Sequence, residues 1–279
     1  MRKLYEERGI LFSVLWIAAY CLVMAPIRGS LGWGSVWMLL ALSAFAALAE
    51  NGTLTLATNV NFPPYEFYDD ETGEPTGIDI EIAKAICEKI GYELEVVDID
   101  FGAIIPALAA HSYDFSAAGM TVTEERKQSV QFTDTYATGI QAVIVPGDTE
   151  AGDIYALLEA KGGHIAIGVQ ESTTGDIYIS DEFETAGTAD VQRFKAGADA
   201  VLALTSGQVD CVVIDNEPAK AFVAKNEGLK LLPSAYTEED YAMAFPLDSE
   251  IYETFNAALQ ELMADGTLQG IVDKFIPAE

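Results

Sequence analysis

From Thr53 onward the sequence alternates short apolar segments with amphipathic ones, and this alternation limits the possible folds more than any other feature. Residues 53–58 (TLTLAT) alternate with the period of two that is typical of a β-strand. The next apolar residues recur with helical spacing, at Ile80, Ala83, Ile86, Cys87 and Ile90. A regular strand–helix alternation predicts α/β layers around a largely parallel sheet.

The same patterns continue to the end of the chain. Further strands are predicted at 93–98, 130–132, 139–145, 164–169, 209–214, 229–232 and 242–246. Helices are predicted near 102–111, 123–129, 153–161, 175–185, 197–206, 217–226, 249–264 and 267–275. Two segments, 135–139 and 236–241, each lead into a strand that ends at a proline, and such a pair is typical of a hinge between two lobes.

The first 49 residues have a different composition. Charge is absent from Ile10 to Ile27 and again from Val36 to Ala49, and Ala47-Leu48-Ala49 precedes Glu50 as a signal-peptidase site would. We therefore expect residues 1–49 to be an export leader, cleaved after Ala49, that places the folded part outside the cytoplasm, in the periplasm or on the outer face of the cell membrane.

Two apolar runs are unusual for a simple signal peptide, so other interpretations of the leader stay open. Ile10 to Ile27 is just long enough to span a bilayer and to act as a retained anchor. If translation began at Met24, a normal signal peptide with one apolar run would remain. A misassigned start or a fusion would explain the first apolar run.

The charge balance excludes one large class of partners. The chain has 15 basic and 44 acidic residues, a formal net charge of −29. Nucleic acids are bound by clustered Lys and Arg, so we expect no nucleic-acid partner. Half of the residues are apolar, which requires a folded core with the acidic excess on its surface. Cys87 and Cys211 lie in apolar patterns and are interpreted as buried thiols, and no metal site is predicted.

Four polar clusters follow predicted strands, where α/β sheets place their ligands. They are Asn59–Phe67, Gly119–Arg126, Gln170–Gly175 and Asp215–Pro218. Each also has a plain structural interpretation. Thr121 and Glu124 fit a capping box, Asp215 fits a helix N-cap, and the acidic pairs Asp69-Asp70 and Glu238-Glu239 fit solvated loops.

Taken together, the clusters favour binding of a zwitterion. Arg126 and Arg193 are the only arginines after the leader, and a zwitterion needs one cation and one anion. No hydrolytic motif and no Gly-rich phosphate loop followed by Lys is present, so we do not expect an enzyme.

Residues 52–279 resemble the extracytoplasmic solute-binding proteins of polar-amino-acid ABC importers. Residues 77–86 (GIDIEIAKAI) match the family's signature, a Gly, an apolar residue, Asp, any residue and an acid, on its first helix. Other segments follow in family order, namely Phe62–Phe67, Phe101–Leu108, Gly119–Lys127, Asp210–Asp215 and Asp265–Leu268.

The resemblance implies a role for individual residues. Arg126 would bind the α-carboxylate of an amino acid, helped by Thr121 and the backbone near Thr174, and Asp215 would bind the α-ammonium with the Gly119 carbonyl. The full implied ligand-binding set is Asn59, Phe62, Phe101, Gly119, Met120, Thr121, Arg126, Gln170, Thr173, Thr174, Asp215 and Tyr241. Phe62 and Phe101 would form aromatic walls, and Asn59, Gln170 and Tyr241 would face the ligand side chain or close the rim. Asp79 is interpreted as a helix cap.

The sequence departs from the family pattern at two of these positions. Many relatives that select cations have an acid where Asn59 stands, so we expect a polar, uncharged amino acid. Ser172 replaces the usual glycine of its turn, so the backbone there need not approach a ligand in the usual way.

The resemblance also implies the architecture and the partners. Lobe 1 would comprise 52–135 plus 242–279 and lobe 2 would comprise 141–236, with 136–140 and 237–241 as the hinge. The protein would act without a cofactor, as a monomer that delivers its ligand to an ABC transporter permease. Two alternatives stay open: a dehydratase on the same scaffold, for which Glu171 is the candidate acid, and the sensing domain of a membrane receptor.

Overall fold

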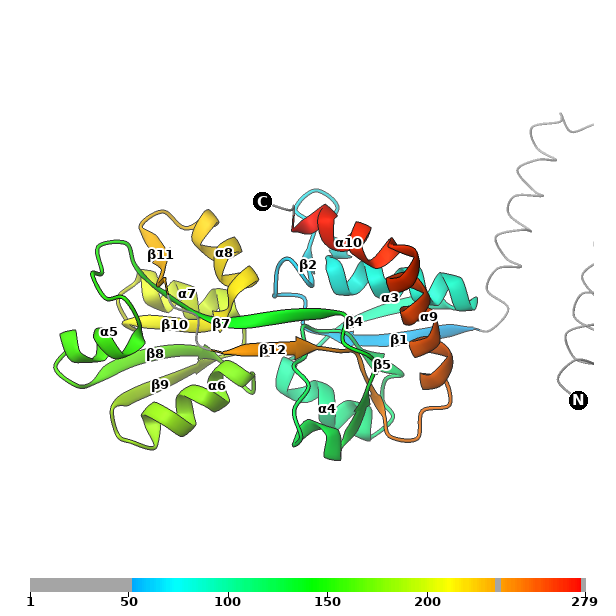
Figure 1. The fold of residues 1–279 in the computed structure, drawn as a ribbon, viewed down its shortest axis with the longest axis horizontal. Coiled ribbons are helices and arrows are strands. Elements are labelled where there is room, and N and C mark those ends of the chain that lie inside the picture. The colour runs from blue at the N-terminus through cyan, green and yellow to red at the C-terminus, as the bar shows by residue number, and fades with distance from the viewer. Residues whose placement is uncertain (1–51, 234–236, 277–279) are drawn as a thin grey trace, which may run out of the picture. The chain divides into compact units, whose positions relative to one another are not determined.

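The computed structural model describes residues 52–233 and 237–276, so the predicted leader and its alternatives lie outside the described residues. Residues 51–279 form a compact unit separate from residues 1–50. The described chain folds into two large β-sheets, each accompanied by helices, and one small two-stranded sheet (Figure 1). Among these residues, no helix combines the length and the apolar character that crossing a membrane requires.

The first lobe is built on a five-stranded sheet with the order β4-β1-β5-β13-β6. Its strands are β4 (Glu93–Asp98), β1 (Thr53–Thr58), β5 (Phe115–Ser116), β13 (Ala244–Pro246) and β6 (Val130–Phe132). The first three strands are parallel, and β13 runs antiparallel to both β5 and β6. Helices α3 (Ile78–Ile90), α9 (Tyr252–Asp265) and α10 (Thr267–Phe275) lie on one face and α4 (Phe101–Ala109) on the other (Figure 1). A small hairpin of β2 (Phe67–Tyr68) and β3 (Pro75–Thr76) precedes α3.

The second lobe is built on a sheet with the order β11-β7-β10-β8-β9, to which β12 adds by pairing with β7. These strands are β11 (Leu229–Leu231), β7 (Ala137–Pro146), β10 (Cys211–Asp215), β8 (Ile165–Gln170), β9 (Ala189–Phe194) and β12 (Glu238–Tyr241). The helices of this lobe are α5 (Ile154–Ala160), α6 (Thr174–Ile179), which continues as the π-helical turn η3 (Ser180–Glu184), α7 (Gly197–Thr205) and α8 (Asn216–Lys225).

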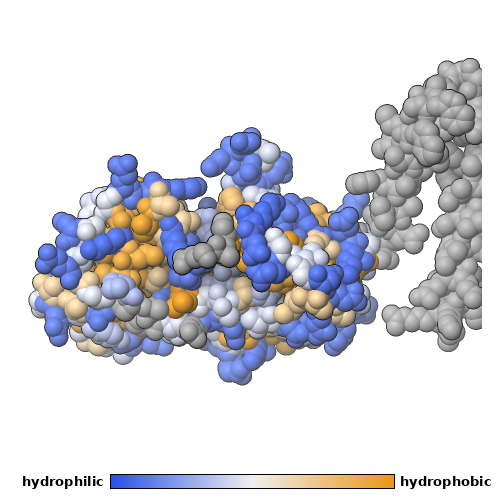
Figure 2. Space-filling model, turned by 45° about the horizontal axis from the view of Figure 1, so that its top comes forward, coloured by the Kyte–Doolittle hydropathy of each residue, from blue (hydrophilic) through white to orange (hydrophobic). Residues whose placement is uncertain are grey.

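Helices cover both faces of this second sheet, which explains why its central strands β8 and β10 are almost continuously apolar. Successive side chains of a strand point to opposite faces. Val212 and Ile214 therefore pack with residues of α7 and α8, whereas Val213 packs with residues of α5, α6 and η3. Cys87 and Cys211 are buried free thiols, as predicted. Hydrophilic residues dominate the visible surface, as the acidic composition requires, although apolar side chains gather over part of the second lobe (Figure 2).

Two antiparallel strands carry the chain between the lobes. The chain leaves the first sheet after β6 and enters the second through β7, and it returns through β12 into β13. β7 and β12 pair side by side, with Gly139 opposite Glu239 and Ala137 opposite Tyr241 (Figure 1). The division into lobes at the stated boundaries, with 136–140 and 237–241 as a hinge, stays a prediction.

The start of α3 is capped by backbone rather than by a side chain. The N–H groups of Ile78 and Asp79 donate to the carbonyls of Pro64 and Tyr65, at 3.0 and 2.9 Å. Gly77 is the N-cap residue and has φ 125° and ψ 177°, a conformation that only glycine adopts readily. The prediction that Asp79 caps the helix is therefore wrong, because the loop carbonyls already satisfy the first N–H groups.

Two other local predictions also change. The helix expected at 123–129 is a single 3₁₀ turn, η2 (Arg126–Gln128). The capping box is wrong, because the Thr121 hydroxyl donates to Glu239, and it is the Thr123 hydroxyl that accepts from the N–H of Arg126 at the start of this turn. Strand β9 was not predicted, because its polar residues hide the strand pattern. It is defined by its parallel pairing with β8 over the whole strand.

The close approach at Gly77 leads to a stability prediction. A Cβ at this position would lie 2.2 Å from the Tyr65 carbonyl oxygen, in addition to the unfavourable backbone conformation. We expect Gly77→Ala to lower the free energy of unfolding by at least about 3 kcal/mol, measured by denaturant titration. Gly73→Ala is the matched control. Gly73 also has a positive φ, of 71°, but nothing lies within 4 Å of its Cβ position, so the cost there should be about 1 kcal/mol. Equal losses would contradict the backbone-overlap argument.

Candidate binding site

A cavity between the two lobes brings together polar segments that are far apart in the sequence. Its empty volume is about 300 Å³, including its opening to solvent. The lining residues are Asn59, Phe62, Glu66, Phe101, Ala118, Gly119, Thr121, Arg126, Gln170, Thr173, Thr174 and Asp215. Most of them follow the carboxyl ends of β1, β5, β8 and β10, which is where α/β sheets place ligands.

Arg126 is the cation of this cavity. Its side chain comes from η2 in the first lobe and is only 8% exposed. One guanidinium nitrogen donates to the Thr121 carbonyl at 2.8 Å, and the other donates across the cleft to the Ser172 carbonyl at 3.2 Å. The guanidinium also lies 5.4 Å from the centre of the Phe101 ring. Burial lowers the pKa of Arg126. Both acceptors are neutral carbonyls, so neither bond neutralises the positive charge.

Asp215 is the acid that the second lobe contributes. It ends β10, is 5% exposed and accepts a hydrogen bond from the Tyr241 hydroxyl. Although Asp215 stands at the N-cap position of α8, its side chain makes no capping hydrogen bond. Burial, and then the charge of Glu239, raise the pKa of Asp215 to about 7. The ionised form of a buried carboxyl group with a raised pKa is stabilised when a cation binds beside it.

Glu239 joins the two lobes beside the cavity. Its carboxylate accepts hydrogen bonds from the Thr121 hydroxyl of the first lobe at 2.9 Å, and from the Thr174 hydroxyl and Gln141 amide of the second at 2.8 and 3.1 Å. The interpretation of this acid as a solvated loop charge is wrong, because Glu239 is only 5% exposed. The pairing of β12 with β7 turns its side chain inward, and that pairing is not visible in the local sequence.

Amide side chains form another part of the wall. Gln170 donates from Nε2 to the Asn59 Oδ1 at 3.0 Å, which connects β8 with the loop after β1. Asn59 in turn donates from Nδ2 to the Ile99 carbonyl at 2.9 Å. The Gln170 Oε1 is buried and has no hydrogen-bond partner among the described residues. The hydrogen-bonding capacity of this acceptor is therefore unused among the described residues.

Glu66 is a lining residue that the sequence analysis did not assign. It follows Tyr65 in the loop that caps α3 and is 1% exposed. Burial, and then the charge of Asp79, raise its pKa well above the ordinary value. The loop was recognised from its motif, but the motif did not indicate which side chain turns inward.

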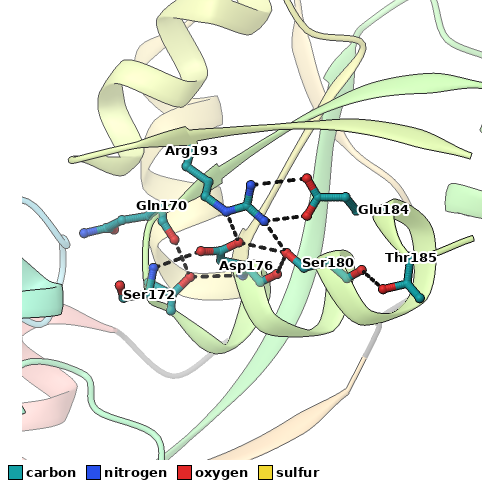
Figure 3. Close-up of polar contacts among 8 residues, drawn as sticks. Gln170, Ser172, Asp176, Ser180, Glu184, Thr185 and Arg193 are labelled. Atoms are coloured by element: carbon teal, nitrogen blue, oxygen red, sulfur yellow. Dashed lines mark hydrogen bonds and ion pairs between the residues drawn. The ribbon is translucent and has the colours of Figure 1, made fainter. Parts of the chain in front are cut away.

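Arg193 supports the turn that carries the second lobe's contribution. Its guanidinium pairs with Glu184 at 2.6 Å and with Asp176 at 2.9 Å and donates to the Ser180 hydroxyl at 2.7 Å (Figure 3). Asp176 also accepts from the Ser172 N–H at 3.0 Å, and Ser172 has φ 68°. The serine that replaces a glycine thus keeps the left-handed backbone, held by Asp176, and its carbonyl accepts from Arg126.

Ten of the predicted ligand-binding residues line the cavity, and two do not. Met120 is 1% exposed and packs in the core beneath α4 with Ile104 and Leu108. Tyr241 is fully buried behind Asp215 and reaches the cavity only through its hydrogen bond to that carboxyl group. Ala118 and Glu66 line the cavity without having been predicted.

Two sheets joined by a pair of crossing strands, with polar side chains of both lobes around one cavity, define a two-lobed α/β binding protein. A sequence model of the bacterial extracellular solute-binding proteins, family 3, matches residues 54–278. The chain belongs to this family, whose members serve as transport binding proteins.

Known relatives agree with this assignment. The arginine-binding extracellular protein ArtP of Bacillus subtilis is 31% identical over 87% of this chain and 98% of its own length. A probable histidine-binding protein of Campylobacter jejuni is 32% identical over 82% of this chain and 88% of its own length. Among solved structures, an ancestral arginine-binding protein bound to glutamine has a TM-score of 0.75 at 37% identity, covering 82% of this chain and 99% of its own. A structure of an ancestral arginine-binding protein bound to arginine has a TM-score of 0.74 at 38% identity. It covers 81% of this chain and 98% of its own.

The contacts of Glu239 predict its effect on stability. Glu239→Ala leaves the hydroxyls of Thr121 and Thr174 without their acceptor. It also removes the shorter of the two hydrogen bonds that Gln141 Nε2 donates. An unsatisfied buried donor costs about 1–3 kcal/mol, so we expect a loss of about 2–4 kcal/mol after partial rehydration, measured by denaturant unfolding. The exposed neighbour Asp240 is the control, and its replacement by Ala should change the stability by less than about 0.5 kcal/mol. A Glu239→Ala protein as stable as the control would contradict the role described for this carboxylate.

Proposed function

We propose that this protein binds a free α-amino acid between its lobes and delivers it to an ABC importer. The supporting observation is that one cavity holds a buried arginine of the first lobe, bonded only to neutral carbonyls in the described hydrogen bonds, and a buried acid of the second lobe. A zwitterion supplies a partner to each of them at once, and water is excluded from both charge pairs.

The geometry favours a definite orientation of the ligand. The α-carboxylate pairs with Arg126, and the α-ammonium pairs with Asp215 and the Gly119 carbonyl. The hydroxyls of Thr121 and Thr174 already donate their protons to Glu239. Arg126 therefore supplies the principal donors to the carboxylate.

The remaining lining residues favour a side chain that donates hydrogen bonds without carrying a charge. The unpartnered Gln170 Oε1 requires a donor. Once the α-groups have used Arg126 and Asp215, the acid that remains in the cavity wall is Glu66, whose raised pKa favours its neutral form. A cationic side chain would then lack a counter-charge. We therefore favour glutamine or a similar polar, uncharged amino acid, and arginine and histidine, for which the relatives are named, are the competing ligands to test.

The proposal includes the location and the partner. We propose that the leader directs the domain out of the cytoplasm and that a membrane permease receives the ligand from a monomer. The dehydratase alternative gains no support from its candidate acid, because Glu171 is not among the lining residues and pairs with Lys195 at 2.7 Å.

Binding of an amino acid and the role of Arg126 are testable together. Calorimetry on residues 50–279 should detect one of glutamine, arginine or histidine, and the corresponding decarboxylated amine should not bind. Charge-assisted hydrogen bonds contribute about 1.5–3 kcal/mol each, so Arg126→Ala should weaken binding about 100-fold or more. The adjacent exposed Lys127, which pairs with Glu124, is the matched control, and Lys127→Ala should bind as the parent does. Equal affinity for the amino acid and its amine would contradict the assignment.

The raised pKa of Asp215 predicts how the affinity depends on pH. The α-ammonium requires the ionised carboxylate, whereas the free protein protonates Asp215 below a pKa of about 7. Affinity should be fully present above pH 7 and should fall as the pH drops below it, by up to about tenfold per pH unit, with release of a proton on binding. Calorimetry in buffers of different ionisation enthalpy measures this proton. Asp215→Asn should bind more weakly and lose this part of the pH dependence; an unchanged profile would assign the titration to another group.

A further inference from the structure

Two carboxyl groups lie against each other beneath the cavity. Glu66 lines the cavity and is 1% exposed, and Asp79, in the first turn of α3, is fully buried. The two side chains hydrogen-bond each other. This contact follows from the docking of the loop at Pro64 and Tyr65 onto the start of α3.

The hydrogen bonds of the pair require a proton. Asp79 Oδ2 accepts from the Gly119 N–H at 2.8 Å and from the Tyr136 hydroxyl at 2.7 Å. Asp79 Oδ1 and Glu66 Oε2 are buried, and neither has a donor among the described residues. Ionised carboxylates only accept hydrogen bonds, so two of them cannot satisfy each other. A single proton between the two oxygens satisfies both.

The position of that proton follows from the other contacts. The two donors at Oδ2 stabilise the ionised form of Asp79, whereas no comparable pair of donors from the described residues reaches the carboxyl group of Glu66. We propose that Glu66 carries the shared proton at neutral pH and donates it to Asp79, and that this acid pair is the positioning device for the ammonium side of the cleft. The functional half of this inference rests on the proposed function.

Asp79 connects the proposed ammonium site with the crossing between the lobes. Gly119, which it holds by the backbone N–H, has φ 51°, and a Cβ there would lie 2.7 Å from the Phe62 ring. The hydrogen bond from Asp79 and the packing of the Phe62 ring therefore fix the turn at Gly119 from two sides. They also fix the direction of the Gly119 carbonyl. Tyr136 immediately precedes β7, and its N–H donates to the Tyr241 carbonyl at 3.0 Å.

The surroundings of the pair favour the neutral form of one member. Four titratable groups lie around it: Tyr136 is hydrogen-bonded to Asp79, Tyr65 is close to Asp79, and Asp215 and Asp98 are close to Glu66. None of these four groups is a cation. Burial raises the pKa of Asp79 to about 7 in spite of its two donors, and it raises the pKa of Glu66 well above its ordinary value.

The variant Glu66→Gln tests the proton directly, because the glutamine amide donates to Asp79 as the protonated acid does. The infrared spectrum of the parent at pH 7 should contain the carbonyl band of a buried carboxylic acid, and Glu66→Gln should reduce it. The folded-state pKa of Glu66 exceeds its unfolded value, so its contribution to stability is present at acidic pH and is lost as the pH rises towards the folded pKa. Between pH 5 and 7 the folding equilibrium constant of the parent should therefore fall by up to about tenfold per pH unit relative to Glu66→Gln.

The positioning role is tested by binding of L-glutamine and L-arginine. Glu66→Ala, which leaves Asp79 without this donor, should bind at least about tenfold more weakly than Glu66→Gln, which keeps a donor at the same place. Glu88→Gln is the control. It removes an exposed acid from α3, the helix that carries Asp79, and it should follow the parent in every measurement.

The outcomes separate this inference from the proposed function. If neither amino acid binds the parent, the proposed function fails, whereas the infrared band and the stability profile still test the shared proton. If Glu66→Gln retains the full band and the parent's pH profile, the shared proton on Glu66 is overturned. If Glu66→Ala binds as tightly as Glu66→Gln, the positioning role is overturned.

Discussion

The structure depends on the docking of one loop onto the start of one helix. The carbonyls of Pro64 and Tyr65 accept from the first N–H groups of α3, and Gly77 allows the approach because it has no Cβ. This contact replaces the side-chain cap that a helix usually needs. As a result Asp79 is released from capping, and its carboxyl group meets Glu66 and the Gly119 turn. The lower wall of the cavity is thus a consequence of how α3 begins.

Burial governs the chemistry of the acids around the cavity. The chain as a whole is strongly acidic, and solvent screens most of these charges because they lie on the surface. Glu66, Asp79 and Asp215 are shielded from solvent, and burial is the first cause of the raised pKa of each. Opposite them, Arg126 keeps its charge while bonded to carbonyl oxygens. The cavity therefore combines one buried cation with acids whose ionised forms are disfavoured by burial.

The sequence predicted the local elements and most of the cavity because both follow from short patterns. Strand and helix periodicity located β1, α3 and β10 within a residue or two, and the rule that ligands bind after strand ends located Asn59, Gln170 and Asp215. The failures at Glu239, Asp79 and β9 depend on contacts between distant segments. Glu239 turns inward through the pairing of β12 with β7, Asp79 is freed by a loop that precedes it by 14 residues, and β9 is recognisable only beside β8.

The two arginines after the leader show why residue type alone does not identify a binding residue. Arg193 pairs with Asp176 and Glu184, so its charge is compensated within the second lobe, and its function is to hold the turn at Ser172. Arg126 donates to the carbonyl of Ser172 in that same turn. Arg193 therefore holds in place one of the acceptors of Arg126. Among the described residues, the Arg126 guanidinium donates to carbonyl oxygens and not to a carboxylate, and Asp215 lines the same cavity from the other lobe. A zwitterion compensates both without changing the net charge of the cleft, whereas a simple cation or anion compensates one and leaves the other buried and unpaired. Under the proposed function, the arrangement of these two charges on separate lobes would also link recognition of the ligand to closure around it.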